Sequence, residues 1–508
     1  MKPDTVSQPR SWLALAQALI AGAVLPLAFS PLDLWPLQLL SVAWLYALLQ
    51  TSAPRRAAEL GLAYGLGAFG VGTSWVYVSI HDFGNAPPPL AGFITAGFVL
   101  LLASCLALQC YAYRRFCKHA WAVVPSFAAL WVLDEWLRGW LFTGFPWLYL
   151  GYAQVTTLFS GLAPLFGVLG LSFFIALSGA LLGELALRWR RLHQPDRLAR
   201  TRISLALLML WALCIPTRNI AWTTPLDAPP LRVALVQGNI EQSVKFDPNY
   251  LQQALERYSE LSLPLWRNDL LVWPETAIPL VYQRVPALVE QWQLQADAAG
   301  ATLISGIFFE DEFDGSIHNS LVAFGEGEGV WLKQKLVPFG EYVPLRRFLS
   351  GLLQLFALPQ SSLEPGPADQ QTLWAGDASI APFICYEVVY ADFVRRYGRD
   401  ADLLLTVSND TWFGSSWGPH QHLQMAAMRA RELGRYMLRA TNNGITALIN
   451  ERGHIIARAP QFTATTLEGE ALRFSGRTPF ARWGNWPVLM LSLVIVALSA
   501  LLRSDGKK

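Results

Sequence analysis

Long apolar runs constrain this chain more than any other feature of its sequence. A bilayer core needs about 20 mostly apolar residues per helix. Runs of suitable length lie at residues 11–29, 35–51, 58–80, 89–113, 120–140, 161–187, 203–220 and 486–502. The seventh is the weakest, because only residues 203–215 are cleanly apolar before Pro216. The sequence therefore predicts a bundle of about eight transmembrane helices, seven of them in the first 220 residues.

The composition supports a membrane protein and excludes two other classes. Of the 508 residues, 53% are hydrophobic and only 15% are charged, and the mean hydropathy is +0.31. Soluble globular chains carry about 25% charged residues. A disordered chain or a nucleic-acid-binding protein is therefore excluded, and no nucleic-acid partner is expected.

Basic residues alternate between successive loops, and this pattern predicts the orientation. They occur before the first run, around residues 55–56, 114–118 and 188–202, and again at 503–508, whereas the loops between these positions hold almost none. By the positive-inside rule those loops and both termini are cytoplasmic. We therefore expect a transmembrane domain at 1–220, an outward-facing domain at 221–485, and a last helix with a cytoplasmic tail at 486–508.

The region after residue 221 has the pattern of an α/β domain. Short β-like runs occupy 231–237, 270–273, 302–309, 320–324, 380–384, 403–407 and 446–449. Amphipathic stretches at 247–262, 285–299 and 418–440 have helical spacing. Alternation of strands and helices predicts a layered α/β fold.

Three predicted strand ends carry chemically useful side chains. Glu275 follows a strand and Pro274, Lys333 lies in a KQK segment, and Cys385 follows the run 380–384. Cys385 is also the lone cysteine of the predicted outward region, so it is either buried and inert or kept free for its reactivity. Together these residues form a candidate nucleophile, base and fixed cation.

These segments resemble a known family. The order Glu…Lys…Cys is similar to the nitrilase superfamily. The fuller motifs at 273–279 (WPETAIP), 336–344 (LVPFGEYVP) and 384–387 (ICYE) resemble bacterial apolipoprotein N-acyltransferases. Segments 74–80 (SWVYVSI), 135–139 (EWLRG) and 144–148 (GFPWL) extend the resemblance into the apolar region.

The resemblance implies an α-β-β-α sandwich on the outer face of the bacterial inner membrane. It implies transfer of an acyl chain from a phospholipid, mainly phosphatidylethanolamine, to the α-amino group of a diacylglyceryl-cysteine on an apolipoprotein. It also implies a catalytic set of Glu275, Lys333 and Cys385. Supporting positions are Glu341, Tyr386 and Glu387, and positions near the substrates are Trp147, Phe246, Asn319 and Pro344. Where the family often has His two residues after its lysine, this chain has Lys335, so Lys333 is chosen by its eight-residue spacing to Glu341.

The chemistry of these residue types predicts a ping-pong reaction. A free thiol has a pKa of about 8.5, so an adjacent base must activate it. Glu275 is the expected base, Cys385 holds the acyl group as a thioester, and Lys333 stabilises the oxyanion. No metal site is expected, because His420 and His422 have no third ligand nearby. No other cofactor is implied, and a monomer is expected.

Other interpretations stay open at this stage. A membrane-tethered amidase acting on a small soluble amide would use the same three residues, and a transporter or assembly factor would need none of them. Within the apolar region, Arg138 is expected to pair with Asp134 or Glu135. Trp75, Trp140 and Trp147 are expected to lie in interfacial aromatic belts.

Overall fold

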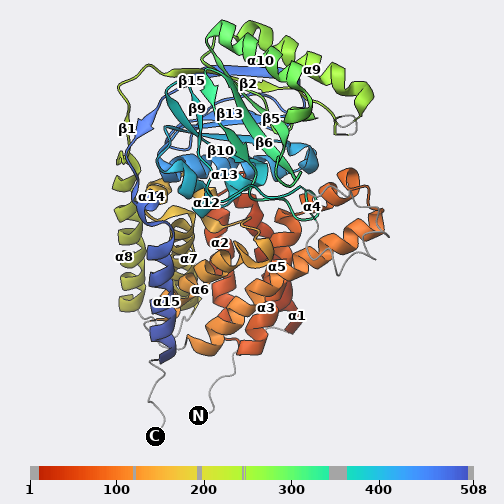
Figure 1. Cartoon of the computed structure of the whole chain (residues 1–508). Coiled ribbons are helices and arrows are strands. Elements are labelled where there is room, and N and C mark those ends of the chain that lie inside the picture. Colours follow the sequence, from red (N-terminus) through yellow and green to blue (C-terminus); the bar gives the residue numbers. More distant parts are fainter. Residues whose placement is uncertain are drawn as a thin grey trace, which may run out of the picture. The chain divides into compact units, whose positions relative to one another are not determined.

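The computed structural model describes residues 11–117, 122–190, 197–242, 245, 247–342 and 363–501. The chain forms two compact units. The helical unit contains the described residues up to Tyr77, then Pro87–Ile220, and the described residues from Trp483 onward. The sheet unit contains Val78–Ala86 and Ala221–Arg482. Figure 1 shows the ribbon of the whole chain.

The helical unit is built from helices joined by short turns. Its helices are α1 (Ser11–Val24), α2 (Pro36–Leu49), α3 (Pro54–Gly72), α4 (Trp75–Val78, whose last residue belongs to the sheet unit), α5 (Pro88–Phe116), α6 (Val123–Arg138), α7 (Ala163–Arg190), α8 (Arg197–Cys214) and α15 (Trp486–Leu501). Single turns are η1 (Leu25–Ala28), η3 (Leu141–Thr143), η4 (Leu150–Gln154), η5 (Ser160–Leu162) and η6 (Pro216–Asn219).

The described residues contain 3 helical segments long and apolar enough to cross a membrane. They are Pro88–Phe116, Ser160–Trp189 and Arg197–Asn219, so the segment expected to be weakest is one of them. Shorter apolar helices lie at Trp12–Ala28, Pro36–Leu49 and Trp486–Leu501. The full count of eight spans stays a prediction.

One expected span has different bounds. The run 58–80 is not one helix, because α3 ends at Gly72 and α4 begins at Trp75. The segment η2 (Ser79–Phe83) then packs with the sheet unit, where Ser79 Oγ donates to the Trp412 carbonyl at 2.7 Å. The residues on both sides of this break are apolar, so hydropathy alone does not reveal where the helix ends.

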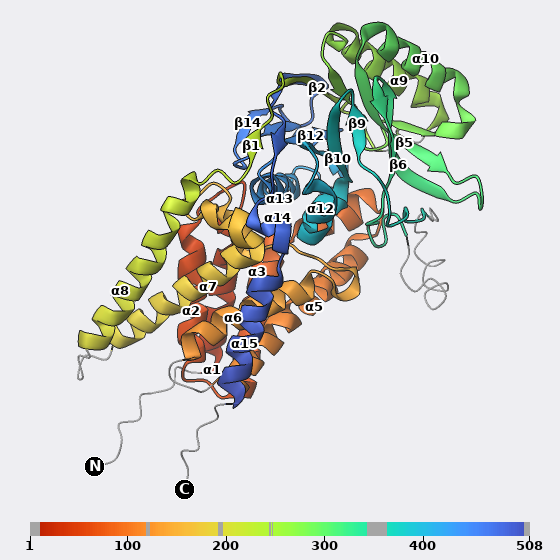
Figure 2. The same ribbon diagram turned by 60° about the vertical axis from the view of Figure 1, so that its left-hand side comes forward.

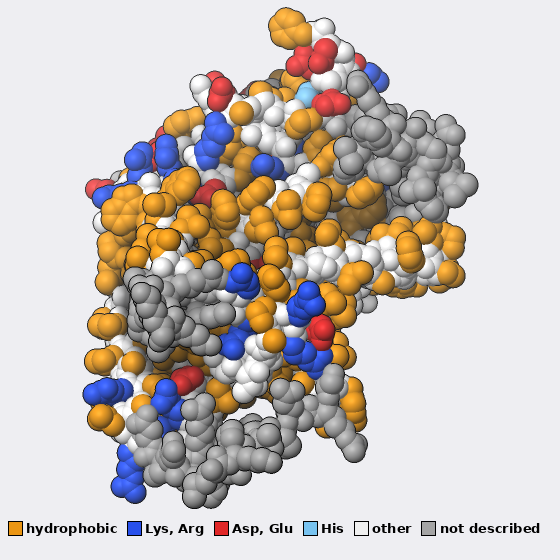
Figure 3. Space-filling view, turned by 90° about the horizontal axis from the view of Figure 1, so that it is seen from below, with side chains coloured by type: hydrophobic (Ala, Val, Ile, Leu, Met, Phe, Trp, Pro, Cys, Tyr) orange, Lys and Arg blue, Asp and Glu red, His pale blue; other side chains and the backbone are white. Residues whose placement is uncertain are grey.

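Apolar side chains remain exposed on the helical unit. Phe93, Leu108, Leu208 and Leu213 are each at least 60% exposed, and many other large apolar side chains are exposed along α1, α5, α8 and α15. Figure 3 shows hydrophobic side chains at the surface together with scattered Lys and Arg. Exposed apolar patches of this kind are typical of proteins that contact a membrane.

The charged residues of α6 are buried and paired. Nε of Arg138 lies 2.9 Å from Oδ2 of Asp134, which confirms the expected pair, and Nη1 donates to the Trp147 carbonyl at 3.1 Å. Glu135 accepts from Trp131 Nε1 and from the Leu150 N–H. Every one of these charged groups therefore has a local partner.

The interpretation of the tryptophans as an interfacial belt is wrong for two of them. Trp147 and Trp75 are 1% and 8% exposed, whereas Trp140 is 52% exposed. The Trp147 ring stacks on Phe145 at 5.0 Å and lies 5.2 Å from the ring of Trp75. The GFPWL segment folds back into the helical unit, so these rings bury their apolar faces against each other.

The sheet unit contains two large sheets and a small one. The first sheet has the order β15 (Thr465–Ala471), β2 (Leu231–Gln237), β3 (Leu270–Val272), β5 (Thr302–Glu310), β6 (Ile317–Gly325), β8 (Val330–Leu332), with β4 (Ile278–Val281) paired to β5. The second has the order β14 (Ile455–Arg458), β13 (Ala447–Ile449), β12 (Met437–Thr441), β11 (Leu403–Ser408), β10 (Ala378–Ile384), β9 (Leu373–Ala375), β7 (Gly327–Glu328). Strands β1 (Thr224–Pro225) and β16 (Phe474–Ser475) form the small sheet.

Each large sheet has a parallel centre. In the first, β2, β3 and β5 are parallel, and in the second β10, β11 and β12 are parallel. Parallel strands need crossover connections, and the helices supply them. The carboxyl ends of parallel neighbours meet at one edge of a sheet, so side chains that follow these strands converge.

The two sheets face each other across one core, with helices outside. The core between the sheets includes Val233, Leu235 and Val272 from the first sheet and Ile380 and Leu405 from the second. Helices α9 (Pro248–Ser262) and α10 (Pro286–Ala299) cover the first sheet, and α12 (Ala391–Gly398) and α13 (Gly418–Leu433) cover the second (Figures 1 and 2). The expected α-β-β-α sandwich is confirmed. The unit also contains the short turns η7 (Leu263–Leu265), η8 (Tyr282–Arg284), η9 (Cys385–Val389) and η10 (Asp410–Phe413). The short helix α14 (Pro479–Trp483) follows, and its last residue belongs to the helical unit.

The expectation of one helix over 418–440 is wrong. Helix α13 ends at Leu433, and Gly434 takes the left-handed conformation with φ +62°. Glycine adopts this conformation without steric cost and commonly ends helices. The chain then enters β12, so Arg439 lies on a strand.

Candidate active site

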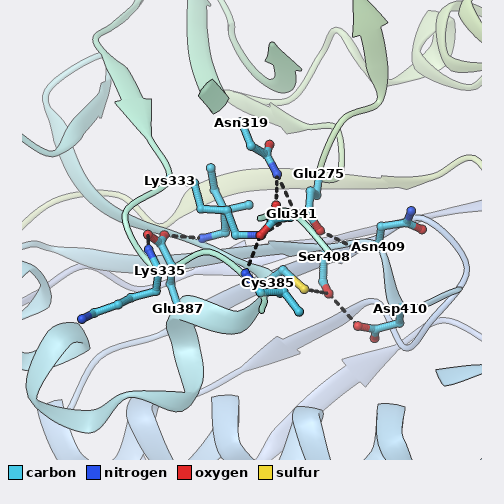
Figure 4. Close-up of polar contacts among 12 residues, drawn as sticks. Glu275, Asn319, Lys333, Lys335, Glu341, Cys385, Glu387, Ser408, Asn409 and Asp410 are labelled. Carbon is cyan, nitrogen blue, oxygen red and sulfur yellow. Dashed lines mark hydrogen bonds and ion pairs between the residues drawn. The ribbon is translucent and has the colours of Figure 1, made fainter. Parts of the chain in front are cut away.

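The ends of three strands bring Glu275, Lys333 and Cys385 into one cluster in the sheet unit (Figure 4). Glu275 follows β3 through Trp273 and Pro274, Lys333 follows β8, and Cys385 follows β10. Two of these strands belong to the first sheet and one to the second. The site therefore lies where the two sheets of the sandwich meet.

Lys333 forms the centre of the ionic contacts. Its Nζ lies 2.9 Å from Oε1 of Glu275 and 2.8 Å from Oε1 of Glu341, and its side chain is 1% exposed. Lys335 points elsewhere, and its Nζ lies over the Tyr390 ring at 5.5 Å (Figure 4). The choice of Lys333 over Lys335 is thus the one that the geometry favours.

Two asparagines also donate hydrogen bonds to the carboxylates. Nδ2 of Asn319 donates to Glu275 Oε1 at 2.8 Å and to Glu341 Oε1 at 3.1 Å. The backbone N–H of Asn409 donates to Glu275 Oε2 at 2.8 Å. Asn319, expected near the substrates, therefore has both amide hydrogens committed to the two carboxylates.

The backbone at Cys385 is strained. Its φ is +52°, a left-handed conformation that non-glycine residues adopt rarely and at a cost of about 1–3 kcal/mol. The residue lies on the sharp turn from β10 into η9, and it is partly exposed. Strain of this kind clusters at active sites, because it is tolerated where it presents a functional side chain.

Glu387 holds this turn against the lysine segment. One carboxylate oxygen accepts from the N–H groups of Gln334 (2.7 Å) and Lys335 (3.2 Å), and the other from the Ile384 N–H (2.8 Å) and Trp331 Nε1 (3.2 Å). The carboxylate thereby joins the segment after Lys333 to the residue before Cys385. Burial raises the pKa of Glu387 to about 7, although the N–H donors oppose the shift.

The ionisation states follow from these contacts. Burial alone would raise the pKa of Glu275, but the Lys333 ammonium and the Asn409 N–H outweigh it and hold that pKa below its ordinary value. The pKa of Lys333 is raised, because the two carboxylates outweigh its burial. Burial and the Glu275 charge raise the pKa of the Cys385 thiol. The resting site therefore holds a carboxylate, an ammonium and a neutral thiol.

Lys245 is a second buried cation that the sequence motifs did not identify. It is 4% exposed, and its Nζ donates to the Glu275 carbonyl at 3.1 Å. Burial lowers its pKa to about 8, and the charge of Glu275 partly offsets this. The polar residues around it in the sequence are typical of an exposed lysine, so only its tertiary contact shows that it belongs to the site.

Gly306 on β5 allows the chain to approach Glu275 closely. A Cβ at this position would lie 2.3 Å from the Thr276 N and 2.5 Å from the Pro274 carbonyl. Any larger residue would push the Glu275 turn away. A glycine inside a strand signals such an approach, and this signal was present in the sequence.

The remaining predicted positions lie in different places. Tyr386 follows Cys385 in the turn η9, and its ring meets Tyr390 edge to face at 5.2 Å. Trp147 lies in the helical unit with its ring buried. Phe246 and Pro344 fall outside the described residues. Within the described ranges, no group of three or more His, Cys, Asp or Glu residues could hold a metal ion.

Comparison with known proteins agrees with these observations. The family model of the carbon-nitrogen hydrolases matches residues 232–471, and that of the apolipoprotein N-acyltransferase N-terminal domain matches residues 21–181. The chain is an acyltransferase with a carbon-nitrogen hydrolase domain.

Relatives over the whole length make the assignment more specific. The apolipoprotein N-acyltransferase of Azotobacter vinelandii is 47% identical, with 97% of this chain and 96% of that protein covered. That of Pseudomonas syringae pv. tomato is 44% identical, with 98% of each covered. The chain belongs to the apolipoprotein N-acyltransferase family. A carbon-nitrogen hydrolase structure from Xanthomonas campestris is 19% identical, covers 52% of this chain and 97% of its own, and has a TM-score of 0.36.

Proposed function

We propose that this protein transfers an acyl chain from a phospholipid to the α-amino group of the diacylglyceryl-cysteine of apolipoproteins. Phosphatidylethanolamine is the proposed donor. The observation that carries the proposal is the contact of Lys333 with Glu275 and Glu341 beside the thiol of Cys385. The names of the relatives support the acceptor, and the exposed apolar helices support access to lipids.

In the first half-reaction, Cys385 Sγ attacks the ester carbonyl of the phospholipid while Glu275 takes the thiol proton. Negative charge then moves to the carbonyl oxygen, where Lys333 and the Tyr386 N–H are the proposed donors. The ester C–O bond breaks, and Glu275 returns the proton to the departing lysophospholipid oxygen. Losing one donor of this kind typically costs about 10²–10³ in rate.

In the second half-reaction, the α-amino nitrogen attacks the thioester on Cys385. Glu275 takes a proton from the nitrogen, the C–S bond breaks, and the thiol is regenerated with that proton. Glu341 and Asn319 hold Lys333 and Glu275 in place, and Glu387 fixes the turn that carries the nucleophile. The result is an N-acylated lipoprotein by a ping-pong course.

We also propose that the protein acts as a monomer in the inner membrane, with the sheet unit in the periplasm. The basic loops around residues 55–56, 114–118 and 188–202 support this orientation. Both substrates are lipids whose reacting groups lie near the outer headgroup layer, so a site on that side can receive them laterally.

The test uses the purified full chain in detergent with phosphatidylethanolamine and a diacylglyceryl-lipopeptide. We expect N-acylated lipopeptide from the wild type and none from Cys385→Ser or Cys385→Ala. With the acceptor withheld, mass spectrometry should find the acyl group on the Cys385 peptide. A folded wild type that acylates no lipopeptide but releases ammonia from amides would overturn the proposal. Absence of the acyl adduct would overturn the thioester step.

A further inference from the structure

A second polar cluster lies behind Cys385, away from the contacts of Lys333. Ser408, the last residue of β11, places its Oγ 3.4 Å from Cys385 Sγ and 2.6 Å from Oδ1 of Asp410 (Figure 4). Asp410 is 2% exposed, and Ser408 is fully buried. None of the roles described above uses these two residues, although one of them contacts the nucleophilic atom.

The charge of Asp410 is balanced inside the protein. Nη2 of Arg439, a fully buried side chain on β12, lies 2.6 Å from Oδ2 of Asp410. A Cβ on Gly444 would lie 2.2 Å from this same oxygen, so the glycine leaves room for the carboxylate. Burial opposes the charged form, but Arg439 and His422 outweigh it and lower the pKa of Asp410.

His422 connects the cluster to the backbone of the nucleophile. Its Nε2 lies 3.2 Å from the Cys385 carbonyl, and its Nδ1 lies 3.1 Å from Arg439 Nη2 and 3.2 Å from Asp410 Oδ1. Burial and the Arg439 charge lower the pKa of His422, which favours the neutral ring. A neutral ring has one N–H, which can donate from Nε2 to the Cys385 carbonyl or from Nδ1 to Asp410.

A buried ion pair does not by itself imply a function. Arg429 and Glu432 form another fully buried pair on α13 at 2.8 Å, and Arg429 also donates to the Val389 carbonyl. No contact of that pair with Cys385 Sγ is present among the described residues. The distinguishing feature of the Asp410 cluster is therefore the hydroxyl of Ser408 between the carboxylate and the thiol.

The Ser408 hydroxyl has one hydrogen and two neighbouring acceptors. While Cys385 is a thiol or a thioester, the hydrogen belongs to Asp410, which is nearer and charged. When Sγ becomes a thiolate, rotation about the Cβ–Oγ bond turns the hydrogen to sulfur. Asp410 is not left unpaired by this rotation, because Arg439 still contacts it.

We propose that Ser408 is a further catalytic residue, whose hydroxyl donates a hydrogen bond to Cys385 Sγ whenever the sulfur carries negative charge, and that Asp410 and Arg439 position it. In the proposed reaction this happens as Glu275 removes the thiol proton and again as sulfur leaves the thioester. No proton leaves Ser408 in either step. This role rests on the proposed function for its place in the reaction, but the thiolate itself can be tested without any lipid.

The test measures the alkylation of Cys385 by iodoacetamide in the full-length protein, quantified on the Cys385 peptide from pH 6.5 to 10. The charged groups that face the thiol are Glu275, Lys333 and Asp410, with Lys245 beyond Glu275. In Ser408→Ala, the alkylation rate should fall about tenfold at each pH in this range, because losing a hydrogen bond to a charged group lowers the thiolate fraction by about this factor.

Two further variants isolate the hydroxyl. Ser408→Thr and Ser408→Val have side chains of the same shape, so both share the steric cost of the added carbon atoms, and only the threonine should keep a fast rate. Thermal melting of both variants measures the separate cost of losing the hydrogen bond to Asp410. Thr406→Val changes a fully buried residue on the same face of β11 and should leave the profile unchanged. Equal profiles for Ser408→Thr and Ser408→Val, or an equal effect of Thr406→Val, would overturn the proposal. Failure of acyl transfer by the wild type would count only against the proposed function.

Discussion

The ammonium group of Lys333 lies 2.9 Å from the carboxylate of Glu275, although 58 residues separate them in the sequence. Both side chains are buried, and Glu341 makes a matching contact with the same ammonium group. Two carboxylates thus share one cation in a site of low exposure. The ammonium group of Lys333 also holds the pKa of Glu275 below its ordinary value, against the effect of burial.

Substitution of Lys333 therefore tests the centre of the site. In Lys333→Met, acyl transfer should fall at least about 10²–10³-fold, because the oxyanion donor is lost. Glu275 would also lose the cation that contacts its buried carboxylate, at a cost of about 3–5 kcal/mol in the free energy of unfolding. Lys335→Met is the matched control and should retain most activity. Equal losses in both variants would contradict the assignment.

Glu387→Gln should separate the positioning role from stability. The glutamine replaces one of the two acceptor oxygens by an NH₂ group, which then faces N–H donors. We expect a loss of about 1–3 kcal/mol in stability and a fall in kcat with little change in KM. Thermal melting and steady-state lipopeptide acylation measure the two effects. Unchanged kcat would show that the four N–H contacts do not fix the nucleophile.

The lowered pKa of Lys245 should make the free energy of unfolding depend on pH. Its pKa is about 8 in the folded protein, below the ordinary 10.5, so the unfolded chain binds more protons between these values. The contribution of this group to the stability of the wild type therefore rises with pH from about 8 to 10.5. The melting temperature of the wild type should rise relative to Lys245→Met across this window.

The control for this prediction is Lys245→Arg, whose guanidinium stays charged throughout the same range. It should show no such rise relative to Lys245→Met. A wild-type melting temperature that runs parallel to both variants from pH 7 to pH 10 would contradict the lowered pKa.

The pair of Arg138 and Asp134 gives a prediction for the helical unit. Arg138→Met leaves a buried carboxylate without its partner, so the melting temperature should fall by an amount that reflects about 3–5 kcal/mol. Adding Asp134→Asn should recover much of this loss. Arg188→Met breaks another i,i+4 pair, with Glu184, whose side chains are 30% and 21% exposed, and should cost about 1 kcal/mol or less.

Several features of the fold could be predicted from local patterns. The strand at 231–237 has the observed bounds of β2, and Glu275 and Cys385 follow strands as expected. Apolar runs and turn residues express local preferences, so they are visible in one stretch of sequence. The prediction of one helix over 418–440 was wrong because the apolar spacing continues past Gly434. The left-handed backbone conformation of that glycine ends the helix.

Other parts of the site depend on contacts between distant segments. Lys333 and Lys335 have the same residue type and lie two positions apart after β8. Only the contacts of Lys333 with Glu275 and Glu341 distinguish it from Lys335, whose Nζ lies over the Tyr390 ring. Ser408, Asp410 and Arg439 do not belong to any recognisable sequence motif. Their proposed role depends on the tertiary contact of Ser408 Oγ with Cys385 Sγ at 3.4 Å.

The sequence by itself determined that this protein has long apolar runs, a layered domain of alternating strands and helices, and a nucleophile, a base and a cation at strand ends. The tertiary structure decided which lysine pairs with Glu275, that Lys245 is buried beside it, and that Ser408 contacts the nucleophile. The physical reason is that hydropathy and backbone preference act along the chain. Desolvation and ion pairing instead depend on which distant side chains the two sheets bring together.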